Sequence, residues 1–496
     1  MISTQLHRHV LLALLVLLPA LPAAAQSFRV QCPDKTVLHP NGSTPNPLYP
    51  GVVKCQEIAG GDGYATMGDG HQIYLFAFGP LSGIQDITNG LPGTQTASVF
   101  NAAYSGPADA ASLAAALTGA GGVSNAGIYE PAAMMNLGVL SGSAPAPMMA
   151  IDEDDEFFLT LSNVGMIMRP DLFEQHTVHF HGYPNASSFF DGVPDASVAI
   201  NIAGSFTYYY TAPDAGTYFW HCHITPPEHL QMGMVGQLFV RPRQNRVAAG
   251  GSLYTALQTS NIANGVHVAG KVDGSCSDIL CTGATPLPIV LTTAIQPTTT
   301  TPIKYAYNDG DGSTRYDVEM PLQMHGFDPN FHYVGMTFNP EAFADMKDKY
   351  FLLNGRSYPD TINPNPITTL DSDGVSRVSQ PLPSRIVINK TAGQTRALLR
   401  ISDLNVTEFH TLATVGVPMT VIGLNARLLR DQAGTNLYYN TNSINLAGGE
   451  SIDVILDVSD PQYVAGQTFY VYTTNLDHLS NDAENFGGMM TEIVIQ

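Results

Sequence analysis

Residues 176–234 contain the stretches His176-Thr-Val-His179-Phe-His181-Gly, Gly216-Thr-Tyr-Phe-Trp-His221-Cys222-His223 and Pro226-Pro-Glu-His229-Leu-Gln-Met-Gly-Met234. Successive side chains of a β-strand point to opposite faces of the sheet. If these stretches are strands, His179 and His181 share one face and His176 takes the other. By the same alternation, Cys222 points away from its two histidine neighbours. The spacing predicts two groups of side chains placed back to back on adjacent strands.

The first group joins His176 and Cys222 to two residues of the following loop, His229 and Met234. Two imidazoles, one thiolate and one weak thioether are the donor set of a blue-copper (type 1) site. A structural zinc site would use cysteine and histidine without a thioether and usually shows CxxC spacing, which is absent here. An ordinary core cysteine is the other alternative. The softness and the type of the donors predict copper at this site.

The second group consists of four histidines: His179, His181, His221 and His223. A solvated histidine surface is the simplest interpretation of such residues. Two His-x-His pairs on adjacent strands favour a metal site instead, because imidazole is the commonest metal ligand among side chains. We therefore expect a second metal site on the sheet face opposite Cys222.

These motifs resemble those of the multicopper oxidase family. His176-x-x-His179-x-His181 resembles the family's HxxHxH motif, and His221-Cys222-His223…His229…Met234 resembles its HCH…H…M motif. The stretch His179-Phe-His181-Gly, followed by Asp191-Gly-Val-Pro, is similar to the family's first-domain HxHG…DG motif. Five residues separate His223 from His229 where the usual motif has three, and two of the five are prolines.

The resemblance implies a role for the second group. In the family, the positions of these four histidines bind copper in a type 2/type 3 cluster that reduces dioxygen. That cluster uses eight histidines, four from each of two domains, so this stretch supplies one complete half. Cys222 is bonded in the chain to both His221 and His223, which would connect the first copper to the second site.

Asp191 has two interpretations. It resembles the family's acidic residue that serves proton delivery near the cluster, which would make it catalytic. It also directly precedes Gly192, and aspartate before glycine is typical of an ordinary turn. Both interpretations remain open from the sequence.

The C-terminal part of the chain resembles a second copy of the copper-motif segment. Thr217-Tyr-Phe-Trp-His-Cys-His…Gly233-Met234-Val parallels Thr468-Phe-Tyr-Val-Tyr-Thr-Thr…Gly488-Met489-Met. The cysteine and the His-x-His pairs are missing from the second copy, and Asn475 stands near the expected position of the thiolate. No second blue-copper site is expected there.

The second site needs further ligands, and four histidines of the second copy are candidates. His410 and His478 stand near the matching strands, with His325 and His332 as reserves. For each alone, a surface or packed histidine is the alternative. In copper nitrite reductases, which the chain also resembles, a neighbouring subunit adds a histidine. We therefore predict a second copper at a domain interface of a homotrimer, since half a site on a surface needs a complementary surface.

The N-terminus predicts export. Residues 1–25 combine Arg8, an apolar run over residues 10–18 and Ala23-Ala24-Ala25, the pattern of a secretory signal peptide with its cleavage site. The run is too short for a membrane span, and no other run approaches that length. The mature protein is expected to be periplasmic or extracellular.

Charge and cysteine content agree with that compartment. Without residues 1–25 the chain has 20 basic and 42 acidic residues, a net charge of −22. Such a field argues against nucleic acid or an anionic membrane as partner; it favours cations or serves solubility alone. Beside Cys222 there are four cysteines, which allow three pairings. Sequence proximity favours Cys32–Cys55 and Cys276–Cys281, as expected in an oxidising compartment.

Strand-like runs bounded by glycine, proline, asparagine and aspartate recur along the chain and predict an all-β protein. With the resemblance, they predict two cupredoxin-like Greek-key β-sandwich domains. The expected organisation is an N-terminal extension (26–51), a copper-binding domain (52–243) with an insertion at about 83–147, a linker (244–284) and a second, degenerate domain (285–496).

Three functions fit these residues. The first is an exported multicopper oxidase that couples one-electron oxidation of a small-molecule or metal-ion reductant to dioxygen reduction. The second is an enzyme of the copper nitrite reductase type, and the third is a non-catalytic copper-binding or electron-transfer protein. Copper stoichiometry separates them, at about four, two or one per chain, because each type of site needs its own ligand number. No motif identifies the reductant.

Overall fold

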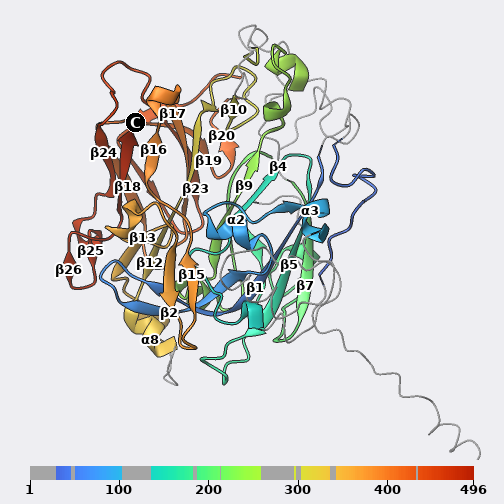
Figure 1. Ribbon diagram of the computed structural model, residues 1–496, viewed down its shortest axis with the longest axis vertical. Coiled ribbons are helices and arrows are strands. Elements are labelled where there is room, and N and C mark those ends of the chain that lie inside the picture. The colour runs from blue at the N-terminus through green and yellow to red at the C-terminus, as the bar shows by residue number, and fades with distance from the viewer. Residues whose placement is uncertain are drawn as a thin grey trace, which may run out of the picture.

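The computed structural model describes residues 30–45, 51–102, 136–182, 187–212, 214–257, 295–297, 303–335, 342–431 and 434–496. The fold is nearly all β-structure, arranged as two β-sandwiches that lie against each other (Figure 1). The predicted all-β class is therefore confirmed. The predicted signal peptide, the Cys276–Cys281 pair and most of the predicted linker lie outside the described residues.

The first sandwich consists of two sheets. One has the order β2-β1-β5-β7, with β3 paired to β1, and the other has the order β4-β9-β8-β6. Their strands are β1 (Val53–Thr66), β2 (Gln72–Pro80), β3 (Gln95–Thr96), β4 (Met149–Asp152), β5 (Glu156–Gly165), β6 (His179–Phe180), β7 (Ser205–Thr211), β8 (Gly216–His221) and β9 (Val235–Arg241).

The second sandwich also has two main sheets, with the orders β20-β19-β23-β17-β12-β13-β25-β26 and β16-β27-β24-β18-β22; β21 pairs with β19. Its strands are β12 (Val318–Phe327), β13 (Tyr350–Leu353), β16 (Ile386–Ile388), β17 (Arg396–Asp403), β18 (His410–Val415), β19 (Met419–Leu424), β20 (Arg427–Leu428), β21 (Tyr439–Thr441), β22 (Ser443–Leu446), β23 (Ser451–Asp457), β24 (Thr468–Thr473), β25 (Ser480–Asn481), β26 (Glu484–Asn485) and β27 (Met490–Ile495).

Short elements connect these strands. There are two small hairpins, β10 (Lys304–Tyr305) with β11 (Arg315–Tyr316) and β14 (Ile367–Leu370) with β15 (Ser376–Gln380). The helices of the described residues include α2 (Ile84–Thr88), α3 (Ala97–Ala102), α6 (Pro226–Gln231), α8 (Pro329–Gly335), η1 (Ser188–Phe190), η2 (Arg243–Arg246), η5 (Phe343–Asp345), η6 (Asp360–Ile362), η7 (Lys390–Ala392) and η8 (Leu476–His478). No helix in the described part is long and apolar enough to cross a membrane.

The two sandwiches repeat one strand order. β2-β1-β5-β7 corresponds to β13-β12-β17-β23, and β4-β9-β8-β6 corresponds to β16-β27-β24-β18. The pairs β1/β5 and β12/β17 are both parallel, as are β4/β9 and β16/β27. The duplication that the sequence predicted is therefore present in the topology. The domain bounds proposed from the sequence stay a prediction.

Strand β8, which leads into Cys222, is buried along its whole length. Its Trp220 packs on Phe78 and Phe180 in the core of the first sandwich. Its opposite face meets β17 and β23 of the second sandwich, where Thr217 Oγ1 donates to Asp453 Oδ1 at 2.5 Å. Covering on both sides explains the run of aromatic and β-branched residues in this strand.

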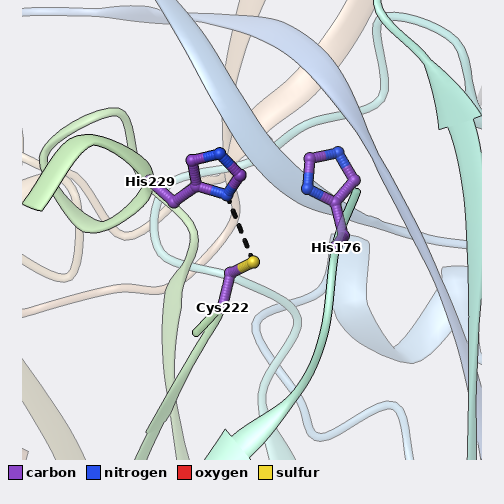
Figure 2. Close-up of side chains that lie close together, drawn as sticks. All are labelled: His176, Cys222 and His229. Atoms are coloured by element: carbon purple, nitrogen blue, oxygen red, sulfur yellow. Dashed lines mark hydrogen bonds between the residues drawn. The ribbon is translucent and has the colours of Figure 1, made fainter. Parts of the chain in front are cut away.

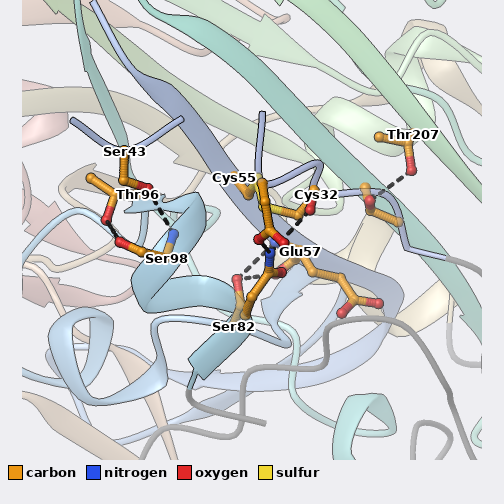
Figure 3. The surroundings of a disulfide bond; sticks show 11 residues. Cys32, Ser43, Cys55, Glu57, Ser82, Thr96, Ser98 and Thr207 are labelled. Carbon is orange, nitrogen blue, oxygen red and sulfur yellow. Dashed lines mark hydrogen bonds between the residues drawn. A yellow bond between two sulfur atoms is a disulfide. The ribbon is translucent and has the colours of Figure 1, made fainter. Parts of the chain in front are cut away.

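The N-terminal segment is attached to the first sandwich by the predicted disulfide between Cys32 and Cys55 (Figure 3). Cys55 lies in β1, and the Glu57 backbone N–H nearby donates to Ser82 Oγ at 2.8 Å. Part of the predicted insertion joins the fold, because β3 pairs with β1 at Lys54 and Cys55. Residues 103–135 of the predicted insertion lie outside the described residues.

Candidate metal centres

The structure brings His176, Cys222 and His229 together in the core of the first sandwich (Figure 2). One ligand atom of each lies within 4.8 Å of the others. His229 Nδ1 is 3.2 Å from Cys222 Sγ, and the rings of His176 and His229 are 5.3 Å apart between centroids. All three residues are fully buried. The alternation of side chains on strands predicted this grouping.

Backbone hydrogen bonds fix the Cys222 thiol and the loop that follows it. The Cys222 N–H donates to Met234 O at 3.1 Å, and the Met234 N–H donates to His229 O at 2.8 Å. The Thr177 N–H points at Cys222 Sγ over 3.4 Å. Met234, the predicted axial ligand, is therefore the cross-strand neighbour of Cys222 and is fully buried.

The long spacing between His223 and His229 forms the short helix α6. It begins at Pro226, and proline suits the first helical positions because their N–H groups need no partner inside the helix. The helix ends at Gln231, so His229 lies in its last turn and faces Cys222. The two extra residues are thus accommodated in a helical turn, and the ligand group stays together.

The donor atoms of this group fit a soft metal ion. His176 Nδ1 and Nε2 are buried without a hydrogen-bond partner, an arrangement that native proteins rarely leave unused. Burial, together with the charge of His229, holds the pKa of His176 well below its ordinary value, so its imidazole is neutral. Burial would also lower the pKa of His229, but Cys222, Glu174 and Glu228 raise it to about 10. Two imidazoles beside a thiolate are the donors that copper selects.

The second group lies on the opposite side of β8. One ligand atom each of His179, His181 and His221 lies within 4.8 Å of the others. His181 Nε2 is 3.0 Å from His221 Nε2, and His179 is paired with His221 across the β6–β8 ladder. His223 is the fourth member, with its ring centroid 5.0 Å from that of His179. All four predicted histidines are therefore neighbours.

Backbone carbonyls orient three of these rings. Nδ1 of His179 bonds Asp191 O at 2.7 Å, Nδ1 of His221 bonds Cys222 O at 2.7 Å, and Nδ1 of His181 bonds Gly449 O at 3.3 Å. A bond at Nδ1 fixes the tautomer that leaves Nε2 free to act as a ligand. Burial is the main cause that lowers the pKa of all three, to about 4 for His181. They are thus neutral donors at physiological pH.

Asp191 contacts this group through His179. Its backbone oxygen accepts the bond from Nδ1, and its carboxylate Oδ1 is 3.5 Å from the same atom. Gly192, with φ +80°, lies so close to Val178 O that a Cβ there would be 1.9 Å from it. The Asp191-Gly192 turn therefore packs directly on the histidine strand, and Asp191 orients His179.

The candidate histidines of the second sandwich occupy two different places. His325 Nε2 bonds Leu230 O at 3.1 Å, and His332 bonds both Gln231 O and Tyr74 O. These two histidines bind backbone carbonyls and hold the second sandwich against the segment between Cys222 and Met234. His410 and His478 are buried and form a separate group with Glu408.

One residue at the first site was missed by the sequence interpretation. Glu174 Oε2 lies 3.5 Å from His229 Nε2, on the side of the ring away from Cys222. The residue stands two positions before His176, and Glu408 stands two positions before His410. This repeated Glu-x-His spacing is the signal that could have identified it.

A two-sheet β-sandwich with a His/Cys/His group in its core defines a cupredoxin-type domain suited to copper. Residues 128–245 match the family model described as multicopper oxidase, in agreement with the resemblance that the sequence motifs predicted. The relatives include the multicopper oxidase MCE of Talaromyces pinophilus, 32% identical over 21% of this chain and 16% of that protein. A copper-containing nitrite reductase of Neorhizobium galegae is 34% identical over 21% of this chain and 25% of that protein.

The matched segment spans only about a sixth to a quarter of the length of these curated relatives. Among solved structures, a blue copper oxidase from Nitrosomonas europaea covers 89% of this chain and 85% of its own, with 17% identity and a TM-score of 0.49. The relatives named here are copper oxidoreductases, and copper is the metal that the donor set of the first site favours.

Proposed function

We propose that this protein is an exported copper-dependent oxidoreductase of the multicopper oxidase type. The observation that carries the proposal is the placement of the two groups on one strand end. Cys222 belongs to the buried His176/Cys222/His229 group. Its chain neighbours His221 and His223 belong to the second histidine group, which is called the outer group below. The covalent bonds of residues 221–223 would thus connect the first site, where a reductant is oxidised, to the second site, where dioxygen is reduced.

Copper, when bound, would supply one-electron redox chemistry at the first site. His176, Cys222 and His229 would hold it, with Met234 as the weak axial donor. The chain itself keeps this site dry, because the first group is buried between Phe76 and the core of the first sandwich. In the second group, His179, His181 and His221 offer neutral imidazoles beside the ring of His223, and Asp191 lies within reach of His179 for proton delivery.

Substitution of the thiolate tests the proposal. Cys222→Ser should remove the intense blue thiolate-to-copper absorption and lower turnover of a one-electron donor to background. Ser162→Ala, a core hydroxyl away from both groups that bonds Glu57, is the matched control and should keep colour and turnover. A Cys222→Ser protein that stays blue would exclude the assignment.

One observation favours an enzyme of the nitrite reductase type as the second candidate. The group within 4.8 Å contains three histidines, the number that a single copper ion needs with one open position, and the chain is similar to copper-containing nitrite reductases. Copper bound at the two groups of the first sandwich distinguishes the candidates: about two ions per chain there support this candidate, and about four support the oxidase.

We also propose that a homotrimer is the active form. The four histidines of the second group are half of the eight that the oxidase cluster requires, so another copy would have to complete it. Phe409, Leu476 and Phe486 of the second sandwich are exposed apolar side chains that suit such a contact. Light scattering of the copper-loaded protein should give three times the mass of one chain; a monomer with full activity contradicts this.

A further inference from the structure

The second sandwich keeps residues at the ladder positions of the first copper group. In the first sandwich the Cys222 N–H donates to Met234 O, and the Met234 N–H donates to His229 O. In the second, the Thr473 N–H donates to Met489 O at 2.9 Å, and the Met489 N–H donates to His478 O at 3.0 Å. Thr473, Met489 and His478 therefore stand where Cys222, Met234 and His229 stand.

The first histidine has a counterpart too. His179 pairs with His221, and continuing that register by one residue puts Val178, two residues after His176, opposite Cys222. In the second sandwich Leu412, two residues after His410, pairs with Thr473. His410 therefore corresponds to His176, and the thiolate is the one ligand of the set that was replaced. The position of the thiolate is held by Thr473, two residues before Asn475, and the parallel between residues 217–223 and 468–474 aligns the same residue with Cys222.

The glutamate contact also recurs. Glu174 Oε2 lies 3.5 Å from His229 Nε2, and Glu408 Oε2 lies 3.1 Å from His478 Nε2. The rings of His410 and His478 are 5.5 Å apart between centroids, close to the 5.3 Å of the first pair. One ligand atom each of Glu408, His410 and His478 lies within 4.8 Å of the others.

One ring nitrogen of each histidine in this group, Nδ1, has no hydrogen-bond partner, whereas the Nε2 atoms of His410 and His478 lie 3.2 Å and 2.8 Å from Asn405 Nδ2 and Asn475 Nδ2. His410 is 0% exposed and His478 is 3% exposed, and Nδ1 of each is buried without a hydrogen-bond partner. A second acid beside Glu408, Asp403, is 0% exposed with Oδ1 at 3.5 Å from His410 Nδ1 and with Oδ2 unsatisfied. Phe351 stacks on the His478 ring at 3.9 Å between centroids and holds it in place. Two fixed imidazoles with neighbouring carboxylates favour a bound cation.

We propose that Glu408, His410 and His478 bind a divalent first-row transition metal ion, at a site separate from both groups of the first sandwich. Two imidazoles and one carboxylate are borderline to hard donors that suit copper(II), zinc(II) or iron(II), and by the general affinity order copper(II) binds most tightly. Because Thr473 provides no thiolate, the bound ion gives no blue absorption. Glu408 is exposed, which leaves the ion a route from solvent.

Crystals of the full-length protein soaked with copper(II), and separately with zinc(II), test the site directly. An anomalous difference peak at the respective metal edge, between His410 and His478, is expected in addition to the peak at Cys222. A map with the Cys222 peak and nothing at His410 and His478 for either ion overturns the proposal.

Solution measurements distinguish this site from a contribution to another copy's cluster. His410→Ala combined with His478→Ala should remove one metal ion per chain and leave the blue absorption unchanged. The matched pair in the first sandwich, His176→Ala with His229→Ala, should abolish the blue absorption and keep that ion. The milder Glu408→Gln should weaken copper(II) binding there by at least about tenfold, the loss typical even of groups that only orient a ligand.

A fourth variant tests whether the ion belongs to a site shared with the second histidine group of another copy. His179→Ala combined with His181→Ala removes half of the outer group and should leave the ion at His410 and His478 in place. If this variant loses the same ion as the His410→Ala, His478→Ala protein, the two sets of histidines form one shared site and the separate site does not exist.

Discussion

At Gly449 the backbone of the second sandwich comes into contact with the outer histidine group of the first. Its carbonyl accepts the bond from His181 Nδ1, and an added Cβ would lie 2.7 Å from that ring. The residue also has φ +88°, a conformation that costs about 1 kcal/mol for other residues. Glycine at this position therefore lets the second sandwich orient a ligand of the proposed second site.

We expect Gly449→Ala to displace the His181 ring and to reduce copper binding at the outer group by about tenfold. The blue site should be unaffected, because His176, Cys222 and His229 lie on the other side of β8. The measurement is copper titration followed by EPR for the non-blue signal and by absorption for the blue one.

Gly393→Ala is the matched control for this change. Gly393 has φ +84° and no atom within 4 Å of an added Cβ, so it brings similar backbone strain without the contact. If both variants lower non-blue copper equally, the effect comes from stability and the orienting role of Gly449 is wrong.

Among the elements, β24 shows most clearly what the duplication preserved. Its register with β18 and β27 puts Thr473 between the two histidines and beside Met489, as β8 puts Cys222 between His176 and His229. The ligand positions of the two sandwiches differ in one side chain, Thr473 in place of Cys222. They also differ in a longer loop before the methionine, because the β25–β26 hairpin separates His478 from Met489. Ligand positions that depend on strand register survive such changes because one slip would invert every side chain.

We therefore expect Thr473→Cys, made in the Cys222→Ser background, to restore an intense blue absorption at about one copper per chain. A thiolate at this position would complete the type 1 donor set with His410, His478 and Met489. Titration with copper(II) followed by visible absorption is the measurement. Asn475→Cys in the same background is the control and should stay colourless. A blue Asn475→Cys protein would show that the assignment of Thr473 to the thiolate position is wrong.

The sequence alone was sufficient to assign side chains to a face of the sheet where the ligands follow the two-residue period of one or two strands. His179, His181, His221 and Cys222 were assigned to the correct faces on that basis alone. The all-β class and the duplication were predictable because glycine, proline and apolar runs recur in both halves. These signals depend only on neighbours in the chain.

The remaining features depend on distant contacts that no local pattern reports. Gly449 reaches His181 across 268 residues of sequence, and Glu408 meets His478 only after β18 and β24 pair. Histidines such as His325 and His332 resembled ligands in the sequence, but tertiary packing uses both to bind carbonyls.

Across the whole molecule, a buried ion cluster joins the sandwiches. Glu319 of β12 bonds Arg400 at 2.8 Å and Arg241 of β9 at 2.9 Å. Arg400 is fully buried and lies 3.7 Å from Asp453, which binds Thr217 of β8. The contact positions β8, and with it Cys222, against the second sandwich. Burial would raise the pKa of Glu319, but Arg241 and Arg400 lower it to about 2.

The sign of the pH effect follows from this shift. The carboxylate of Glu319 has a lower pKa in the folded state than its ordinary value of 4.5, so its stabilising contribution is present above pH 4.5 and is lost as pH falls towards about 2. We expect Glu319→Gln to cost about 3–5 kcal/mol in the free energy of unfolding at pH 7, because two buried guanidinium groups lose their counter-charge. The cost should shrink between pH 4.5 and pH 2, because the Glu319 carboxylate of the unfolded wild-type chain takes up a proton there while that of the folded chain stays charged. Urea unfolding at pH 7 and pH 3 measures both values.

Glu492→Gln, which removes the partner of Arg385 in a more exposed pair, should cost under about 1 kcal/mol. An equal cost of Glu319→Gln at both pH values would show that the cluster contributes through packing and not through charge.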